Sequence, residues 1–135
     1  MKLLIISALA SLFFNVNAWT NFDREEVISF QELPKTAQKF INKHFPQQEI
    51  LSIVCEKEIG SKEYSIYYDN GTEVKFDRKG NWESVECEYS SVPDSVIPKE
   101  ILALVRSKHP EKTVTSITRD LTGRDKGYEV DLDDI

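Results

Sequence analysis

The chain has 135 residues, of which 40% are hydrophobic and 30% are charged, and its formal net charge is −6 at pH 7. This length allows one domain with a modest core. Nucleic acids and anionic membranes bind clustered positive charge, and the sequence has no block rich in Lys or Arg, so neither is expected as a partner.

Residues 1–18, MKLLIISALASLFFNVNA, follow the order of a secretory signal peptide: one lysine, an apolar run, then small residues before a cleavage position. The apolar run is shorter than the roughly 20 residues of a membrane-spanning helix. We expect cleavage before Trp19. The mature chain, residues 19–135, is then a single domain that is periplasmic or secreted and does not insert into a membrane.

Two segments 64 residues apart share one pattern: LPKTAQKFINKHFP at 33–46 and IPKEILALVRSKHP at 97–110. The match continues without a gap into the apolar residues that follow, for example Ile53 with Ile117 and Ile66 with Val130. Such self-similarity indicates duplication of one supersecondary unit. We place the first repeat at about 28–89 and a partial second repeat at about 92–135.

Each repeat predicts a helix bounded by prolines. Pro34 and Pro98 suit the first helical position, and each helix ends before Pro46 or Pro110, because the residue preceding proline is moved out of helical geometry. One side of each helix has apolar residues at the i, i+3, i+4 spacing, namely Ala37, Phe40 and Ile41, then Ile101, Leu104 and Val105. Helices of about three turns need a surface to pack on.

That surface is predicted to be an antiparallel sheet. In the first repeat four strands begin at about Ile50, Lys62, Thr72 and Asn81, with turns at Asp69-Asn70-Gly71 and Lys79-Gly80-Asn81. Alternation places one set of side chains toward the helix, namely Tyr64, Ile66, Tyr68, Val74, Phe76, Val85 and Cys87, and turns Glu73, Lys75 and Asp77 outward. The fold class is therefore α+β.

The second repeat predicts two strands, at about 113–120 and 127–132, as part of a second sheet. Counterparts of the third and fourth strands would fall after residue 135, so half of this sheet is expected to be missing and its last strand to have an unpaired edge. Such an edge pairs with another chain. Asp131, Asp133 and Asp134 weaken self-association by repulsion, which favours a different partner, although pairing with a second copy stays open.

Several phrases resemble the PepSY-like periplasmic proteins, whose fold is similar to the β-lactamase-inhibitor protein. They are Leu33-Pro34, His44-Phe45-Pro46, Tyr64-Ser65-Ile66-Tyr67-Tyr68, Glu73-Val74-Lys75-Phe76-Asp77, Gly80-Asn81-Trp82 and Ile97-Pro98. The resemblance covers the chain from about Glu32 onward. It implies tandem repeats of a helix on an antiparallel sheet, a role in binding or inhibiting an extracytoplasmic protein, and no catalytic residues.

Catalytic and metal chemistry has little support in the residues themselves. His44 and His109 are the usual general bases available, and no G-x-S-x-G motif accompanies them, so we predict that the protein is not an enzyme. Calcium ligands could come from Asp131, Asp133 and Asp134, or from Asp69, Asn70 and Glu73. Neither set has the spacing of the twelve-residue calcium loop, so no metal or cofactor is expected.

Three aromatic residues are the candidate binding residues: Tyr67, Trp82 and Tyr128. Alternation directs Tyr67 and Trp82 to the side of the sheet away from the helix, and Tyr128 lies on the last strand. Tyr and Trp often anchor protein interfaces. The alternative is that these aromatic residues occur here because of their high β-strand propensity. We predict an exported, non-catalytic module that binds a protein or peptide. The alternative is an envelope module that binds calcium or a small ligand.

Cys55 and Cys87 are the two cysteines of the chain. They fall on the first and fourth strands of the first repeat, in phase with core positions. If the strands form a meander, the two residues are about 14 Å apart, whereas a disulfide needs Cα atoms within roughly 7 Å. We predict two buried free thiols.

Overall fold

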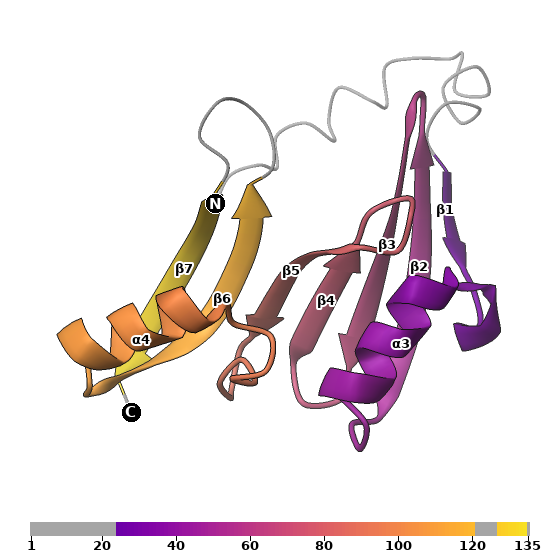
Figure 1. The fold of residues 1–135 in the computed structure, drawn as a ribbon. Coiled ribbons are helices and arrows are strands. Elements are labelled where there is room, and N and C mark those ends of the chain that lie inside the picture. The colour runs from indigo at the N-terminus through magenta and orange to yellow at the C-terminus, as the bar shows by residue number, and fades with distance from the viewer. Residues whose placement is uncertain (1–23, 121–126, 135) are drawn as a thin grey trace, which may run out of the picture.

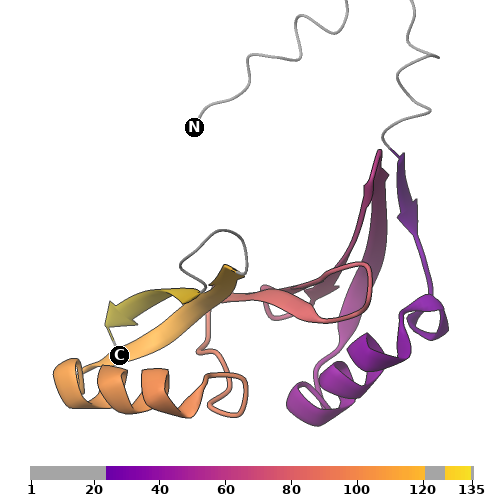
Figure 2. The same ribbon diagram turned by 45° about the horizontal axis from the view of Figure 1, so that its top comes forward.

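A computed structural model of the chain describes residues 24–120 and 127–134, and the predicted signal peptide lies outside them. The described residues form one seven-stranded antiparallel sheet with two α-helices on the same side (Figures 1 and 2). Within the described residues, the opposite side of the sheet carries no helix (Figure 2). The α+β class is confirmed.

The strands follow one another along the sheet in chain order, from β1 to β7, so the predicted meander is confirmed. The elements are β1 (Arg24–Val27), the short 3-10 helix η1 (Phe30–Glu32), α3 (Lys35–His44), β2 (Ile50–Glu58), β3 (Ser61–Tyr68), β4 (Thr72–Phe76), β5 (Trp82–Cys87), α4 (Lys99–Lys108), β6 (Lys112–Asp120) and β7 (Gly127–Asp134).

Prolines delimit both helices, as expected. The first proline of each pair is the N-cap, one position before the first helical position that was predicted for it. Pro34 and Pro98 are the N-caps, each with φ −55°, and their carbonyl oxygens accept bonds from the N–H groups of Gln38 and Leu102 at 3.1 and 3.0 Å. The proline ring fixes φ, and the proline carbonyl begins the helical hydrogen bonds. Each helix ends before the second proline.

The pairing of β2 with β3 recurs 64 residues later between β6 and β7. Ile53 lies opposite Ile66, and Ile117 lies opposite Val130. Even the irregularities agree, because a β-bulge falls between Ile50 and Ser52 in one pair and a second bulge falls between Val114 and Ser116 in the other. The two helix–hairpin segments therefore share one local geometry.

The core lies between α3 and strands β2 to β5. Ala37 and Ile41 of α3 are buried, and they pack over fully buried side chains such as Ile66, Val74 and Phe76. By contrast, α4 has no buried residue; its apolar stripe is half-buried at Ile101 and Val105 and exposed at Leu104. The first helix is better covered than the second.

Two features of the sheet differ from the prediction. Strand β1 was not predicted, because its sequence REEV has no apolar alternation, yet it pairs along β2. The expectation of a second, separate sheet is wrong, because β6 pairs with β5 through Ser84↔Thr118, Val85↔Ile117 and Glu86↔Ser116. Backbone pairing at β5 thus joins the two repeats into one surface.

Two other predictions are confirmed. Cys55 and Cys87 are free and buried, and strands β3 and β4 separate them. Strand β7 lies at the end of the sheet and pairs with β6 alone among the strands that the structure describes.

Candidate functional site: the open face of the sheet

The side of the sheet that faces away from α3 and α4 is here called the open face. Strand alternation from the buried core residues assigns its members. They include Glu25, Val27, Val54, Glu56, Glu63, Ser65, Tyr67, Glu73, Lys75, Ser84, Glu86, Ser116, Thr118, Glu129, Asp131 and Asp133. Most of these side chains are polar, and carboxylates predominate.

One row of residues crosses the open face from β3 to β7. Tyr67 lies opposite Glu73, Glu73 opposite Glu86, Glu86 opposite Ser116, and Ser116 opposite Asp131. Neighbouring strands are about 4.8 Å apart, so these side chains are adjacent. A hollow with a cavity volume of about 420 Å³ lies along the row, and Glu73, Glu86, Ser116 and Asp131 all line it. The row concentrates negative charge over a concave surface.

Lys75 lies in the middle of the open face. Its Nζ atom is 3.9 Å from Glu63 Oε1 and 3.9 Å from Glu73 Oε1. Pairs this long and this exposed add little stability. Lys75 therefore offsets only part of the surrounding negative charge.

Glu83 of β5 is a site residue that the sequence patterns did not identify. Phe76 lies opposite Trp82 while Lys75 lies opposite Ser84, so Glu83 is the extra residue of a β-bulge. Burial, together with a hydrogen bond to Glu63 and repulsion from Glu63 and Asp77, raises the pKa of Glu83 to about 7. Glu63 and Glu83 therefore form a carboxyl pair that favours holding a proton.

Tyr67 lies on the open face, as predicted, and 38% of its surface is exposed. Partial burial, followed by the charge of Glu73, raises the pKa of the Tyr67 hydroxyl. The phenol therefore stays protonated and keeps a hydrogen-bond donor beside the carboxylate row.

The predicted position of Trp82 on the open face is wrong. The bulge at Glu83 shifts the alternation of β5 by one residue and turns Trp82 to the helix side. There its ring stacks at 6.0 Å from Phe40 and at 6.3 Å from Tyr128, and the Arg119 guanidinium lies 5.2 Å from the ring centroid. Trp82 and Tyr128 thus meet each other and do not meet Tyr67.

Arg119 was also missed, although the repeat contains a signal for it. It occupies the position that matches the buried Cys55, which is unusual for a charged residue. Its Nη1 atom donates a 2.9 Å hydrogen bond to the backbone oxygen of Trp82. The contact ties β6 to the start of β5, so we assign Arg119 a structural role.

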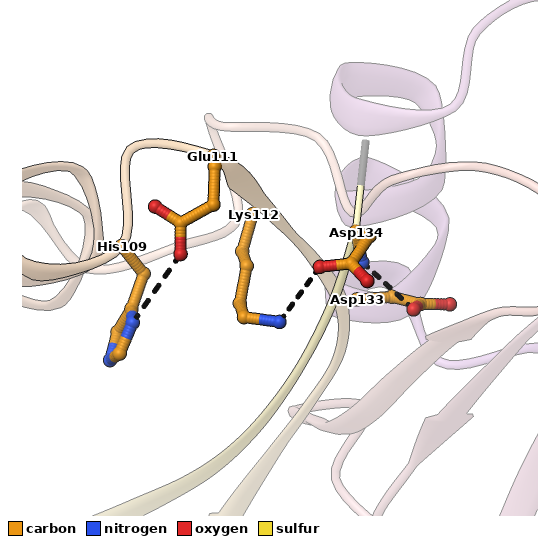
Figure 3. Close-up of polar contacts among 5 residues, drawn as sticks. All are labelled: His109, Glu111, Lys112, Asp133 and Asp134. Atoms are coloured by element: carbon orange, nitrogen blue, oxygen red, sulfur yellow. Dashed lines mark hydrogen bonds and ion pairs between the residues drawn. The ribbon is translucent and has the colours of Figure 1, made fainter.

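The histidines lie far apart in the sequence: His44 is the last residue of α3, and His109 is the C-cap residue of α4. His44 Nδ1 lies 2.7 Å from Ser95 Oγ, and burial followed by the charge of Lys43 lowers the pKa of His44. His109 Nδ1 lies 3.9 Å from Glu111 Oε1, close to the Lys112–Asp134 ion pair (Figure 3). Both histidines therefore lie at helix C-termini, in contact with side chains of the neighbouring loops.

Within residues 24–120 and 127–134, no three His, Cys, Asp or Glu side chains are grouped so that they could hold a metal ion. This includes the predicted calcium candidates Asp131, Asp133 and Asp134 and the turn at Asp69 and Asn70. Asp133 and Asp134 instead take part in local contacts, since Asp133 accepts a bond from the Asp134 N–H and Asp134 pairs with Lys112 at 2.9 Å (Figure 3).

The fold and the open face define a class of small α+β proteins in which helices cover one side of an antiparallel sheet and the other side is free. Within this class the chain belongs to the family described as "Putative beta-lactamase-inhibitor-like, PepSY-like", whose model matches residues 10–66 and 62–134. The resemblance seen in the sequence is thereby confirmed.

Solved structures from two bacteria are similar to the chain. A putative calcium-regulated periplasmic protein from Bacteroides thetaiotaomicron is 36% identical with a TM-score of 0.74, over 80% of this chain and 82% of that one. A putative periplasmic protein from Bacteroides vulgatus has the same values, and another from that organism, of unknown function, is 29% identical with a TM-score of 0.72, over 81% and 85% of the two chains.

No curated protein matches the chain. In the part of the chain that the structure describes, no helix has the length and apolar character needed to cross a membrane.

Proposed function

We propose that the protein is an extracytoplasmic, non-catalytic module that binds a protein or peptide through the open face of its sheet. The observation that carries this proposal is the uncovered face itself, with its hollow lined by Glu73, Glu86 and Asp131 beside the half-exposed Tyr67. Three similar structures described as periplasmic support the location.

The chemistry of the open face favours a basic partner. Rows of carboxylates attract positively charged surfaces and accelerate their association. A tyrosine at the end of such a row supplies an aromatic anchor with a hydrogen-bonding hydroxyl. We therefore expect the partner to present Lys or Arg side chains to the row and an apolar contact to Tyr67.

The proposal also includes the repeat structure of the fold. We infer a tandem repeat like that of the β-lactamase-inhibitor protein, with the second repeat shorter than the first. Support comes from the recurrence of the β2–β3 register, bulge included, in β6 and β7. Two repeats in one continuous sheet give a binding face wider than either hairpin alone.

Capture from an envelope fraction tests the function. Immobilised protein should retain one dominant partner, and the double variant Tyr67→Ala/Glu86→Lys should lose most of it. Glu111→Lys is the matched control, because it reverses an exposed acid away from the open face. Equal capture by the double variant and the unaltered protein would exclude the open face as the binding surface.

A calcium-binding envelope module is the second candidate. It is favoured by the calcium-regulated description of one similar structure. Among the described residues no three potential ligands are grouped for a metal ion, so the test uses Glu86, whose carboxylate lies inside the row between Glu73 and Ser116. Calorimetric titration with calcium chloride should then give saturable heat that Glu86→Gln abolishes. Absence of saturable heat, together with a captured partner, would reject this candidate in favour of the first.

A further inference from the structure

The two repeats differ in what covers their hairpins. In the first repeat the outer edge of β3 pairs with β4, and Tyr64 and Ile66 of β3 are 5% and 0% exposed. The matching residues of β7 are Tyr128, which is 42% exposed, and Val130, which is half-buried. The residues of β7 are thus less buried than their counterparts in β3. Within the described chain, no strand pairs with the outer edge of β7.

The two helices show the same difference in burial. Phe40 of α3 packs edge-on against Phe76 of β4, with ring centroids 5.5 Å apart. Its counterpart 64 residues later is Leu104 of α4, which is 53% exposed. A strand in the position of β4 therefore covers both the hairpin edge and the helix stripe in the first repeat, and β7 with α4 presents the corresponding uncovered surface.

The β3–β4 pairing supplies a template for what fits that surface. Tyr64 lies opposite Phe76 and Ile66 opposite Val74, whereas Ser65 lies opposite Lys75 on the open face. Transferred to β7, the template requires large apolar residues opposite Tyr128 and Val130, facing α4. The residues at the alternate positions of the segment would lie opposite Glu129 and Asp131.

The negative charge of β7 determines which side chains fit at the open-face positions of a docked segment. Glu129, Asp131 and Asp133 alternate along the open side of the strand and are exposed. Opposite charges on directly paired residues stabilise a sheet, and like charges destabilise it. A fitting strand therefore carries Lys or Arg at its open-face positions.

A second copy of the chain fits less well. Antiparallel pairing of two β7 strands brings their carboxylates together, and β1, the strand at the opposite edge, has two adjacent acids, Glu25 and Glu26. Both arrangements place like charges across the new ladder, which disfavours them.

We propose that the outer edge of β7, with the stripe of α4 beside it, is a docking site for an extended partner segment that alternates basic and large apolar residues. The segment pairs antiparallel to β7 in the manner of β4 on β3. Backbone hydrogen bonds supply affinity, and the alternating side chains supply specificity. This surface is at the sheet edge and does not involve Tyr67.

Synthetic peptides test the proposal with the full chain. A peptide containing TKVKF, the β4 sequence with its glutamate replaced by lysine, should bind about tenfold more tightly than one containing TEVEF, measured by fluorescence anisotropy. Glu129→Lys should reverse this preference, because residue 129 would lie opposite the second lysine of the bound TKVKF peptide, as Ser65 lies opposite Lys75. Glu25→Lys, the same change at the opposite edge, and Tyr67→Ala should keep it.

Hydrogen exchange locates the bound peptide. Binding of the TKVKF peptide should slow amide exchange along β7 and leave β1 unchanged. Slowed exchange at β1, or loss of peptide binding in Tyr67→Ala, would overturn the edge assignment and leave the open-face proposal standing. Sedimentation equilibrium that shows a dimer, together with slowed amide exchange along β7 in that dimer, would identify a second copy as the occupant, which also overturns the proposal.

Discussion

At the scale of single residues, Glu83 has the largest effect on the surface of the sheet. As the extra residue of the bulge in β5 it turns Trp82 toward Phe40 and places its own carboxyl group near Glu63. A regular strand would have exposed the tryptophan. One inserted residue thus removes Trp82 from the open face and adds a further carboxyl group to it.

The raised pKa of Glu83 predicts a pH-dependent stability. Its value of about 7 lies above the ordinary 4.5, so the folded state holds a proton that the unfolded chain releases. The stabilising contribution is complete below pH 4.5 and is lost as the pH rises through about 7. Glu83→Gln should therefore be more stable than the unaltered protein at pH 8, by urea denaturation, and similar to it at pH 4.

Glu58→Gln serves as the control, because Glu58 is exposed at the end of β2 and is not among the groups that act on Glu83. This variant should keep the original pH profile. A Glu83→Gln profile that falls as steeply as that of the unaltered protein would show that the carboxyl pair is not its source.

Gly80 is required both by its backbone and by its neighbours. Its φ is +87°, and a Cβ atom there would lie 2.7 Å from Pro34 Cβ and 3.0 Å from the Ala37 nitrogen. Gly80→Ala should lower the free energy of unfolding by about 3 kcal/mol, from backbone strain plus overpacking. Gly60→Ala, at φ +80° with open space around it, should cost only about 1 kcal/mol. Equal costs in chemical denaturation would contradict the contact with Pro34.

At the scale of elements, α3 and α4 have the same length and the same proline caps but different surroundings. Helix α3 places Phe40 among the rings of His44, Phe45, Phe76 and Trp82. Helix α4 places Leu104 in solvent. Identical local signals therefore give helices with unequal tertiary support, since short helices depend on packing for their stability.

This inequality predicts different costs for matched truncations. Phe40→Ala should lower the free energy of unfolding by about 3 kcal/mol, because it leaves a cavity among packed rings. Leu104→Ala should cost less than about 1 kcal/mol, because the side chain is already 53% exposed. Urea denaturation of both variants measures this, and equal losses would mean that the leucine is covered in solution.

Sequence patterns identified both helices and six of the seven strands, because proline geometry and period-two alternation are local signals. The meander assumed for the first repeat holds, but the pairing of β5 with β6 was not foreseen. They did not identify β1, whose REEV sequence is held by pairing with β2 rather than by an apolar face. They misplaced Trp82, because a bulge adds a residue without a residue-type signature. Tyr67 was placed correctly, since β3 is regular opposite β4.

At the scale of the whole molecule, the join between β5 and β6 makes one surface from two repeats. Figure 2 shows a helix beneath each end of the sheet and the strands continuing between them. The Arg119 guanidinium reinforces the join through Trp82. This continuity could not be predicted from the repeat alone, because each copy carries signals for its own hairpin but none for pairing with its neighbour.

The two buried thiols have a consequence for how the chain reaches this fold. Cys55 and Cys87 are protected only after β3 and β4 have taken their places between them. In an unfolded chain both thiols are accessible, and an oxidising compartment can couple them. That disulfide is incompatible with the native strand order, because its Cα atoms must lie within roughly 7 Å. Closure of the β2–β5 meander is thus the step that separates the two thiols and protects them from oxidative trapping.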